Sequence, residues 1–190
     1  MRQVRIALLM MLIMTILLGL IYPLMMTGIA QLVFSYKANG SLDQLGGQTV
    51  GSELLAQSFT SPGYFHGRPS ANNYDGANSG GSNLGPTNRK LIDAVVMRAE
   101  QVRSENRLAQ GTKVPADLVL ASGSGLDPHI SEAAALFQAG RVARARGMKE
   151  EDVVRLIGRH LEKRYFGLFG DSYINVLLLN MELDAAGKAR

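Results

Sequence analysis

The chain has 190 residues, a net charge of +4 and a mean hydropathy of +0.04, which suits one ordinary domain plus a short appendage. It contains no cysteine, so disulfide bonds, thiolate catalysis and cysteine-ligated metals are excluded. Arg2 and Arg5 carry a charge of +2 ahead of the main part of the chain, where the remaining charges nearly balance. The folded part is therefore not basic enough to indicate a nucleic-acid partner.

An apolar N-terminal segment predicts a membrane-spanning helix. Every residue from 6 to 36 is uncharged, and 24 of those 31 residues are apolar. As a helix, the stretch from Ile6 to Met26 would span about 31 Å, which matches the hydrocarbon thickness of a bilayer. We therefore expect a cytoplasmic N-terminus at residues 1–5 and a transmembrane helix over 6–34 with its apolar core at 6–26. Residues 35–190 would form an external domain.

The charges that flank this segment predict its orientation. Arg2 and Arg5 precede it, whereas Lys37 is the first charge after it and Asp43 follows soon. Because basic residues stay on the cytoplasmic side, we expect the domain to lie outside the cytoplasm. A cleavable signal peptide would share this orientation, and residues 28–30 have the small-x-small form of a cleavage site. Apolar cores of such peptides run about 7 to 15 residues, which favours an uncleaved anchor here.

Three residues of the predicted span could mediate contact between helices. Pro23 cannot donate a hydrogen bond to the carbonyl of Gly19, and Thr15 lies one turn before Gly19 on the same face. Small residues at this spacing allow membrane helices to approach closely. Proline and glycine are also simply common in membrane helices, so both interpretations remain open.

Residues 60–86 are rich in glycine, proline and asparagine, and are too long for an ordinary loop. Phe59, Tyr64, Phe65 and Tyr74 lie within or beside this segment, and aromatic residues are rare in disordered linkers. We therefore predict a structured loop region with short strands, one of them near 49–59.

Helical patterns follow the turn-rich segment. Apolar residues at helical spacing predict an amphipathic helix over about 88–107. Asp127-Pro128 offers a cap and a first-turn proline for a second helix that ends at Gly147, and a third begins near Lys149. The apolar stretch 173–183 is expected to start as a buried strand and continue as a helix. Because these elements do not alternate regularly, the pattern predicts one α+β domain.

The sequence offers little support for catalysis or metal binding. His66, His129 and His160 are each isolated, so none forms a recognisable metal-ligand pair. The glycine-serine run 121–125 lacks the flanking glycines of a nucleophile elbow. It could present backbone N–H groups to a phosphate, but Asp127 would repel an anion there, which favours a capping role.

A basic ridge is predicted near the end of the second helix. It contains Arg141, Arg144, Arg146 and Lys149. Its simplest interpretation is a solvated face that complements the helix dipole, with lipid headgroups or an acidic partner as alternatives.

Several segments together resemble a known family. They are 57–59 with 64–70, 79–84 (Ser-Gly-Gly-Ser-Asn-Leu), 118–127, the 37–42 stretch after the anchor, and 176–184. In this order and spacing the chain is similar, nearly end to end, to the KdpC family of the Kdp-type potassium-transporting ATPase.

The resemblance implies a bacterial inner-membrane complex in which a channel-like subunit transports potassium, while a P-type subunit hydrolyses ATP. The family member itself would be a non-catalytic, single-pass protein that helps to assemble and stabilise the complex and holds no cofactor firmly. The family is also described as a catalytic chaperone that raises the ATP affinity of the P-type subunit. Gln138 matches a family glutamine proposed for nucleotide interaction, with a helix-surface amide as the alternative. An external domain would lie away from cytoplasmic ATP, so ATP contact requires inverted topology or an effect transmitted through the span.

The turn-rich region is the predicted contact surface of the domain, placed over the potassium entrance of the channel-like subunit. The anchor would contact the membrane helices of the partners through Thr15, Gly19 and Pro23. The predicted domain contacts are Tyr64, Phe65, Arg68, Pro69, Ser70, Gly80, Gly81, Ser82, Asn83 and Leu84. The alternative is that this loop only supports its own core. A competing function class is a signal-anchored periplasmic ligand-binding protein or hydrolase that acts alone.

Overall fold

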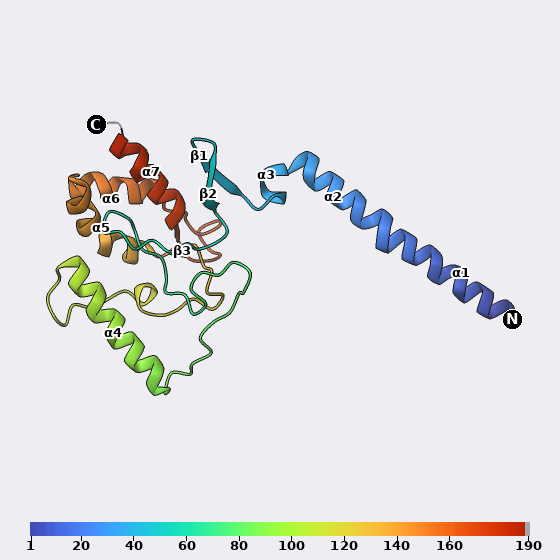
Figure 1. The fold of residues 1–190 in the computed structure, drawn as a ribbon, viewed down its shortest axis with the longest axis horizontal. Helices are drawn as coiled ribbons and strands as arrows, with labels where there is room; N and C mark the ends of the chain where they lie inside the picture. Colours follow the sequence, from blue (N-terminus) through green and yellow to red (C-terminus); the bar gives the residue numbers. More distant parts are fainter. Residues whose placement is uncertain (189–190) are drawn as a thin grey trace. The chain divides into compact units, whose positions relative to one another are not determined.

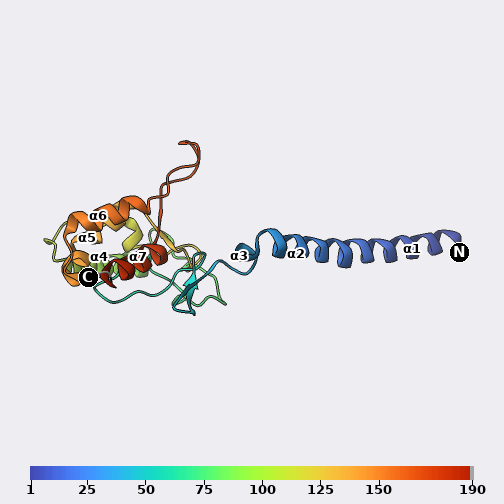
Figure 2. The same ribbon diagram turned by 90° about the horizontal axis from the view of Figure 1, so that it is seen from above.

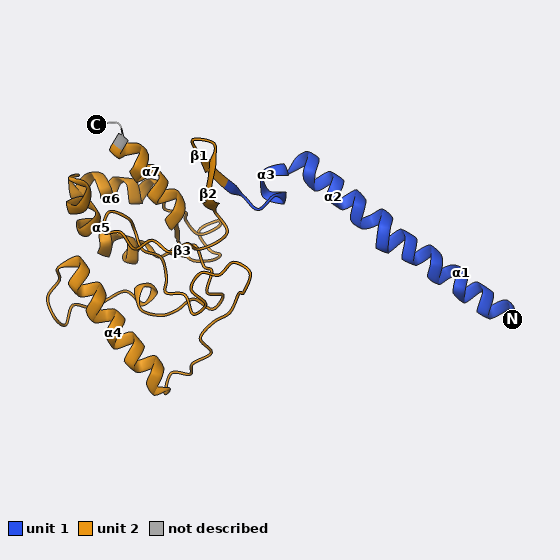
Figure 3. Ribbon diagram, in the orientation of Figure 1, with its two compact units in different colours: residues 1–42 blue, residues 43–190 orange. Residues whose placement is uncertain are grey.

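The computed structural model describes residues 1–188, with side chains described through Gly187. It divides into two compact units, residues 1–42 and 43–190 (Figures 1 and 3). The last two residues of the predicted domain, 189 and 190, lie outside the described residues.

Unit 1 consists mainly of one continuous apolar helix, Arg2–Val33. It is built from α1 (Arg2–Ile16), a wider π-helical turn η1 (Leu17–Ile21) and α2 (Tyr22–Val33). The π-helical turn precedes Pro23, which cannot donate to the carbonyl of Gly19, so the helix accommodates the missing bond by widening. At about 48 Å the helix exceeds the bilayer core, and none of its span is buried. The prediction of one helix long and apolar enough to cross a membrane is confirmed.

A short hairpin follows the helix. After α3 (Ser35–Ala38), strand β1 (Leu42–Leu45) pairs with β2 (Gln48–Ser52). Gly46 and Gly47 join them with φ of +60° and +82°, the left-handed conformations that a tight hairpin turn requires. The predicted strand near 49–59 is therefore only partly correct: it is shorter, and its partner β1 was missed although Gly-Gly is a hairpin signal.

Unit 2 is a mixed helix and strand domain, as the sequence predicts. Its helices are α4 (Arg89–Asn106), α5 (Glu132–Arg146), α6 (Glu150–Arg159) and α7 (Val176–Lys188), with a 3₁₀ turn η2 (Ala116–Leu118) between α4 and α5. Strand β3 (His129–Ile130) pairs antiparallel with β4 (Ile174–Asn175), so that His129 lies opposite Asn175. This pairing joins the segment before α5 to the segment before α7.

The main difference between the predicted and the observed helices is the residue at which α5 begins. Helix α4 begins after Asn88, whose side chain accepts a hydrogen bond from Lys90 N, and α5 ends at Gly147, as expected. The predicted start of α5 at Asp127-Pro128 is wrong. Residues 129 and 130 form β3 instead, and Ser131 caps the helix by accepting a hydrogen bond from Ala134 N. Strand pairing with β4 overrides the local cap signal.

The core of unit 2 surrounds α5. Its buried face consists largely of small residues, among them Ala134, Ala135, Ala139 and Ala143, which let α4 and α6 approach closely. Side chains from α6, α7, β3 and β4 complete the core. Phe65 joins them from the turn-rich segment and is fully buried. Residues 60–86 form no strand, contrary to the prediction, so other contacts must hold them in place.

Candidate functional site

Two buried carboxamides hold the turn-rich segment against the helices. The side chain of Asn180 on α7 accepts a hydrogen bond from Phe65 N (2.8 Å) and donates one to Phe65 O (3.0 Å). Gln138 on α5 does the same for the next residue, with distances of 2.8 Å to His66 N and 3.1 Å to His66 O. Each carboxamide thus replaces a strand partner for one residue of irregular backbone.

The carboxamide of Gln138 is also saturated. Its nitrogen donates a second bond to Ala134 O (3.2 Å), and its oxygen accepts a second one from Arg141 Nη2 (2.7 Å). A glutamine side chain offers two donor hydrogens and two acceptor lone pairs, and all four are used here. The interpretation of Gln138 as a helix-surface amide is wrong, because the residue is only 1% exposed.

Two arginines of α5 bind the backbone of residues 62–64, just before Phe65 and His66. Arg141 Nη1 donates to the carbonyls of Pro62 (2.6 Å) and Tyr64 (3.0 Å), and Arg146 Nε donates to Gly63 O (2.5 Å). Burial, followed by the nearby charge of Arg144, lowers the pKa of Arg141, while Glu105 opposes the shift. The predicted basic ridge is therefore not simply a solvated face.

Helix α7 adds an acidic member to this cluster. Asp184 forms an ion pair with Arg146 (2.8 Å) and accepts a hydrogen bond from the Tyr64 hydroxyl (3.0 Å). The Arg146 guanidinium also lies 4.7 Å from the centre of the Tyr64 ring. We call the side chains of Gln138, Arg141, Arg146, Asn180 and Asp184, which together hold residues 62–66, the latch.

The remainder of the turn-rich segment packs on residues 122–127. Arg68 forms an ion pair with Asp127 (2.9 Å), and Ser122 N donates to Pro69 O (3.1 Å). Gly80 N donates to Ser124 O (2.7 Å), so the two glycine-rich stretches lie against each other. The 121–125 run is thus used for internal packing rather than for an open phosphate cradle.

The residues predicted as partner contacts therefore differ in burial. Phe65 is a core residue with no exposed surface, so its prediction as a surface contact is corrected. Ser82 and Asn83 are exposed, and the rest of the predicted set on the domain is partly buried: Tyr64, Arg68, Pro69, Ser70, Gly80, Gly81 and Leu84. Sequence reasoning missed the latch residues Asn180 and Asp184. The sequence feature that could have indicated a buried role for Asn180 was its carboxamide within the apolar stretch 173–183.

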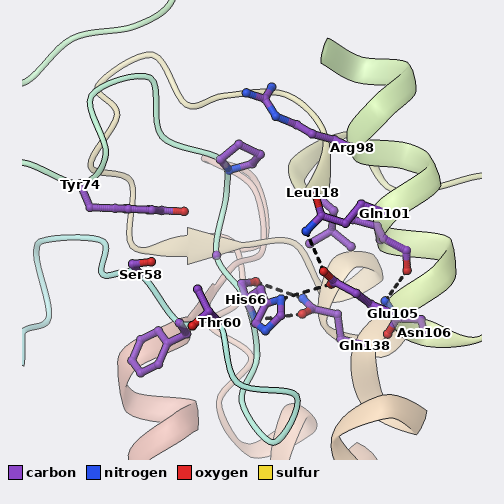
Figure 4. Close-up of a pocket in the computed structure, with 14 residues that line it drawn as sticks. Ser58, Thr60, His66, Tyr74, Arg98, Gln101, Glu105, Asn106, Leu118 and Gln138 are labelled. Atoms are coloured by element: carbon purple, nitrogen blue, oxygen red, sulfur yellow. Dashed lines mark hydrogen bonds and ion pairs between the residues drawn. The ribbon is translucent and has the colours of Figure 1, made fainter. Parts of the chain in front are cut away.

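A cavity of about 300 Å³, lined by both polar and apolar side chains, lies between the turn-rich segment and α4 (Figure 4). Residues from both sides line it, among them Ser58, His66, Tyr74, Arg98, Glu105 and Gln138. Asn106 also lines it, and its buried Oδ1 has no hydrogen-bond partner among the described residues. The cavity is large enough for a small polar ligand or several waters.

The electrostatics of this cavity centre on His66. Its Nε2 lies 3.2 Å from Ser61 O, and its Nδ1 lies 3.6 Å from the Glu105 carboxylate. Burial, and next the charge of Arg141, lower the pKa of His66 despite the opposing effects of Ser61 and Glu105. Burial likewise raises the pKa of Tyr74. Within residues 1–188 no group of three or more histidines and acidic residues is placed to hold a metal ion.

The apolar helix, the mixed domain and the latch define the class of protein: a chain with one N-terminal helix long and apolar enough to cross a membrane, followed by a mixed helix and strand domain whose buried polar side chains organise one long irregular segment. A sequence model of the family described as "K⁺-transporting ATPase, c chain" matches residues 4–185. The chain belongs to this family, KdpC.

Curated relatives match over most of their length. The chain is 50% identical over 172 residues to a protein of Koribacter versatilis, covering 90% of this chain and 88% of the relative. It is 51% identical over 187 residues to one of Sorangium cellulosum, covering 97% and 98%. It is 49% identical over 185 residues to one of Mycobacterium bovis, covering 96% and 98%. Each relative is named "Potassium-transporting ATPase KdpC subunit".

Proposed function

We propose that this chain is the non-catalytic subunit that assembles and stabilises a high-affinity, ATP-driven potassium import complex. Its two partners in a bacterial inner membrane are a channel-like potassium subunit, through which the ion passes, together with a P-type ATPase subunit. The observation that carries the proposal is the family match across residues 4–185, which takes in the span and nearly all of the domain. The same end-to-end match favours this function over a periplasmic ligand-binding protein or hydrolase that acts alone.

The anchor and the domain have separate roles in this proposal. The span contacts the membrane helices of the partners along the face of Thr15, Gly19 and Pro23. With Arg2 and Arg5 in the cytoplasm, the domain lies outside, over the potassium entrance of the channel-like subunit. Ser82 and Asn83, the exposed residues of the predicted contact set, together with the partly buried Tyr64 and Arg68, form its contact surface.

We further propose that the chain raises the ATP affinity of the P-type partner without a direct bond from Gln138 to the nucleotide. All four hydrogen-bonding positions of that carboxamide are occupied by His66, Ala134 and Arg141. A nucleotide would have to break these bonds in a buried site, which is unfavourable. Gln138 therefore acts by positioning residues 62–66, and the effect on ATP reaches the P-type partner through the assembled complex.

The test is potassium-stimulated ATP hydrolysis by the channel-like and P-type partners, purified from membranes with and without this chain. We expect the chain to co-purify with them, and its omission to reduce the yield of complex and raise the KM for ATP. Unchanged yield and KM without the chain would contradict the proposal. A chain that purifies as a monomer with hydrolytic activity of its own would support the competing class.

Two latch variants distinguish positioning from nucleotide contact. Gln138→Ala and Asn180→Ala each free one residue of the same backbone segment, but only Gln138 is a candidate for nucleotide contact. We expect both variants to shift the KM for ATP by a similar factor. A shift confined to Gln138→Ala would show that this side chain contacts the nucleotide.

A further inference from the structure

The segment between α6 and α7 forms a hairpin that extends away from the rest of unit 2. Figure 2 shows it as the dark orange loop that rises above the helices. Glu162 and Tyr173 exchange backbone hydrogen bonds of 2.9 and 3.1 Å at its base, and Tyr165 and Phe169 exchange two of 3.0 Å near its tip. Phe166 turns the chain with φ of +52°.

The tip of this hairpin is uncharged and strongly apolar. Residues 165–170 read Tyr-Phe-Gly-Leu-Phe-Gly. The four large side chains are exposed to 69% at Tyr165, 93% at Phe166, 77% at Leu168 and 67% at Phe169. Scattered apolar residues are normal on a protein surface, but four on one projecting turn indicate a binding surface.

The charges of the hairpin are confined to its base. Glu162, Lys163 and Arg164 precede the tip, and Asp171 follows it, paired with Arg164 at 3.0 Å. An apolar end with tyrosine at its edge and charged residues behind it is the pattern of segments that lie at a membrane–water interface.

The chain also keeps the domain that carries this tip close to a bilayer. The candidate span ends at Val33 and unit 2 begins at Asp43. Even fully extended, the residues between them reach only about 30 Å. Whatever the orientation of the domain, it is therefore confined to the membrane surface, where a weak apolar insertion is effective because the local lipid concentration is high.

We propose that residues 165–169 insert into the interfacial region of the lipid bilayer and give the domain a second membrane attachment. The insertion is shallow, because backbone groups on the outer edges of a two-stranded hairpin have no partners in hydrocarbon. Four side chains on a narrow turn are also too few for a stable protein interface, which buries about 800 Å² on each partner. Lipid needs no complementary shape.

The chain contains no tryptophan, so a single introduced indole reports on this tip alone. The test uses the full chain in nanodiscs of phosphatidylcholine and phosphatidylglycerol, with or without lipids that carry a nitroxide quencher on the upper acyl chain. Phe166→Trp places the probe at the tip. Met97→Trp, at a side chain exposed to 68% on α4, is the matched control.

We expect the Phe166→Trp indole to emit at shorter wavelength than the control, to be quenched several-fold more by the labelled lipid and to be protected from aqueous iodide. Adding Leu168→Asp should reduce the lipid quenching several-fold, and the thermal melt should stay unchanged because residue 168 is exposed. If the lipid quenching persists when Leu168→Asp is added to Phe166→Trp, the indole inserts by itself, and that result would overturn the proposal.

Two other results would also overturn it. One is a Phe166→Trp indole as open to iodide as the control and unaffected by labelled lipid. The other is protection that arises only when the channel-like and P-type partners are added, which would make the tip a protein contact. Because insertion is measured first on the chain without its partners, its success or failure is independent of the proposed role in potassium import.

Discussion

The latch shows how single side chains replace secondary structure. Asn180 and Gln138 satisfy the backbone N–H and C=O of Phe65 and His66, which lie 115 and 72 residues away in sequence. Local sequence patterns cannot reveal hydrogen-bonded pairs this far apart in the chain. Gln138 was singled out only by the family resemblance, and its burial was not predicted, because its neighbours on α5 are mostly alanines and alanine gives a weak signal of burial.

Removing one carboxamide of the latch should destabilise the domain strongly. Asn180→Ala leaves the N–H and C=O of Phe65 buried without partners, so we expect a loss of about 3 kcal/mol in the free energy of unfolding. Urea titration of the detergent-solubilised chain, followed by circular dichroism, measures it. Gln110→Ala at an exposed position should change the same quantity by less than about 0.5 kcal/mol. Equal effects of the two substitutions would contradict the role of the latch.

His66 should make the domain less stable in mild acid. Burial and Arg141 lower the pKa of His66 in the folded state below its usual value of 6.5, although Glu105 and the Ser61 carbonyl favour the proton. As the pH falls below 6.5, the unfolded chain takes up the proton first, so the free energy of unfolding decreases.

The measurement is urea unfolding of the wild type and of His66→Gln at pH 7 and pH 5. We expect the wild type to lose more stability between these two pH values than the variant, because the glutamine cannot titrate. Parallel losses in both proteins would assign the acid sensitivity to other groups.

At the scale of elements, the helices were predictable and the long segment between them was not. Helix α4 is specified by a local apolar period and by caps at Asn88 and Arg107. The start of α5 was misplaced because Asp127-Pro128 resembles a cap, whereas pairing of β3 with β4 extends residues 129 and 130. That residues 60–86 are structurally ordered was correctly inferred from their aromatic residues, but the contacts that hold them in place are long-range.

The packing of the two glycine-rich stretches requires the absence of a side chain at Gly125. A Cβ there would lie 2.7 Å from Gly80 O, closer than real contacts permit. Gly125→Ala should lower the free energy of unfolding by about 3 kcal/mol, which combines this overlap with a positive φ of +71°.

Gly111→Ala is the matched control for Gly125→Ala. Gly111 also has a positive φ, +87°, but nothing lies within 4 Å of its Cβ position. We expect only the conformational cost of about 1 kcal/mol. If thermal melts show equal losses for both variants, the close approach of residues 80 and 125 contributes nothing to stability.

At the scale of the whole molecule, the orientation of the span decides how the chain can influence ATP hydrolysis. Average composition hides this feature, because the +4 charge divides between two N-terminal arginines and a nearly neutral domain. If the domain is external, it cannot touch cytoplasmic ATP, and any effect must pass through the span or the partner proteins.

The absence of cysteine makes this orientation directly measurable. We expect Gln110→Cys, at an exposed position of unit 2, to react with a membrane-impermeant maleimide in cells with a permeabilised outer membrane. Gln3→Cys, between the two arginines, should react only after lysis. Replacing Arg2 and Arg5 with glutamate should reduce the labelling of Gln110→Cys in intact inner membranes, since Lys37 then becomes the nearest basic residue to the span. Reaction of Gln3→Cys from outside would place the domain in the cytoplasm, and direct contact with ATP would then become the simpler explanation of its role.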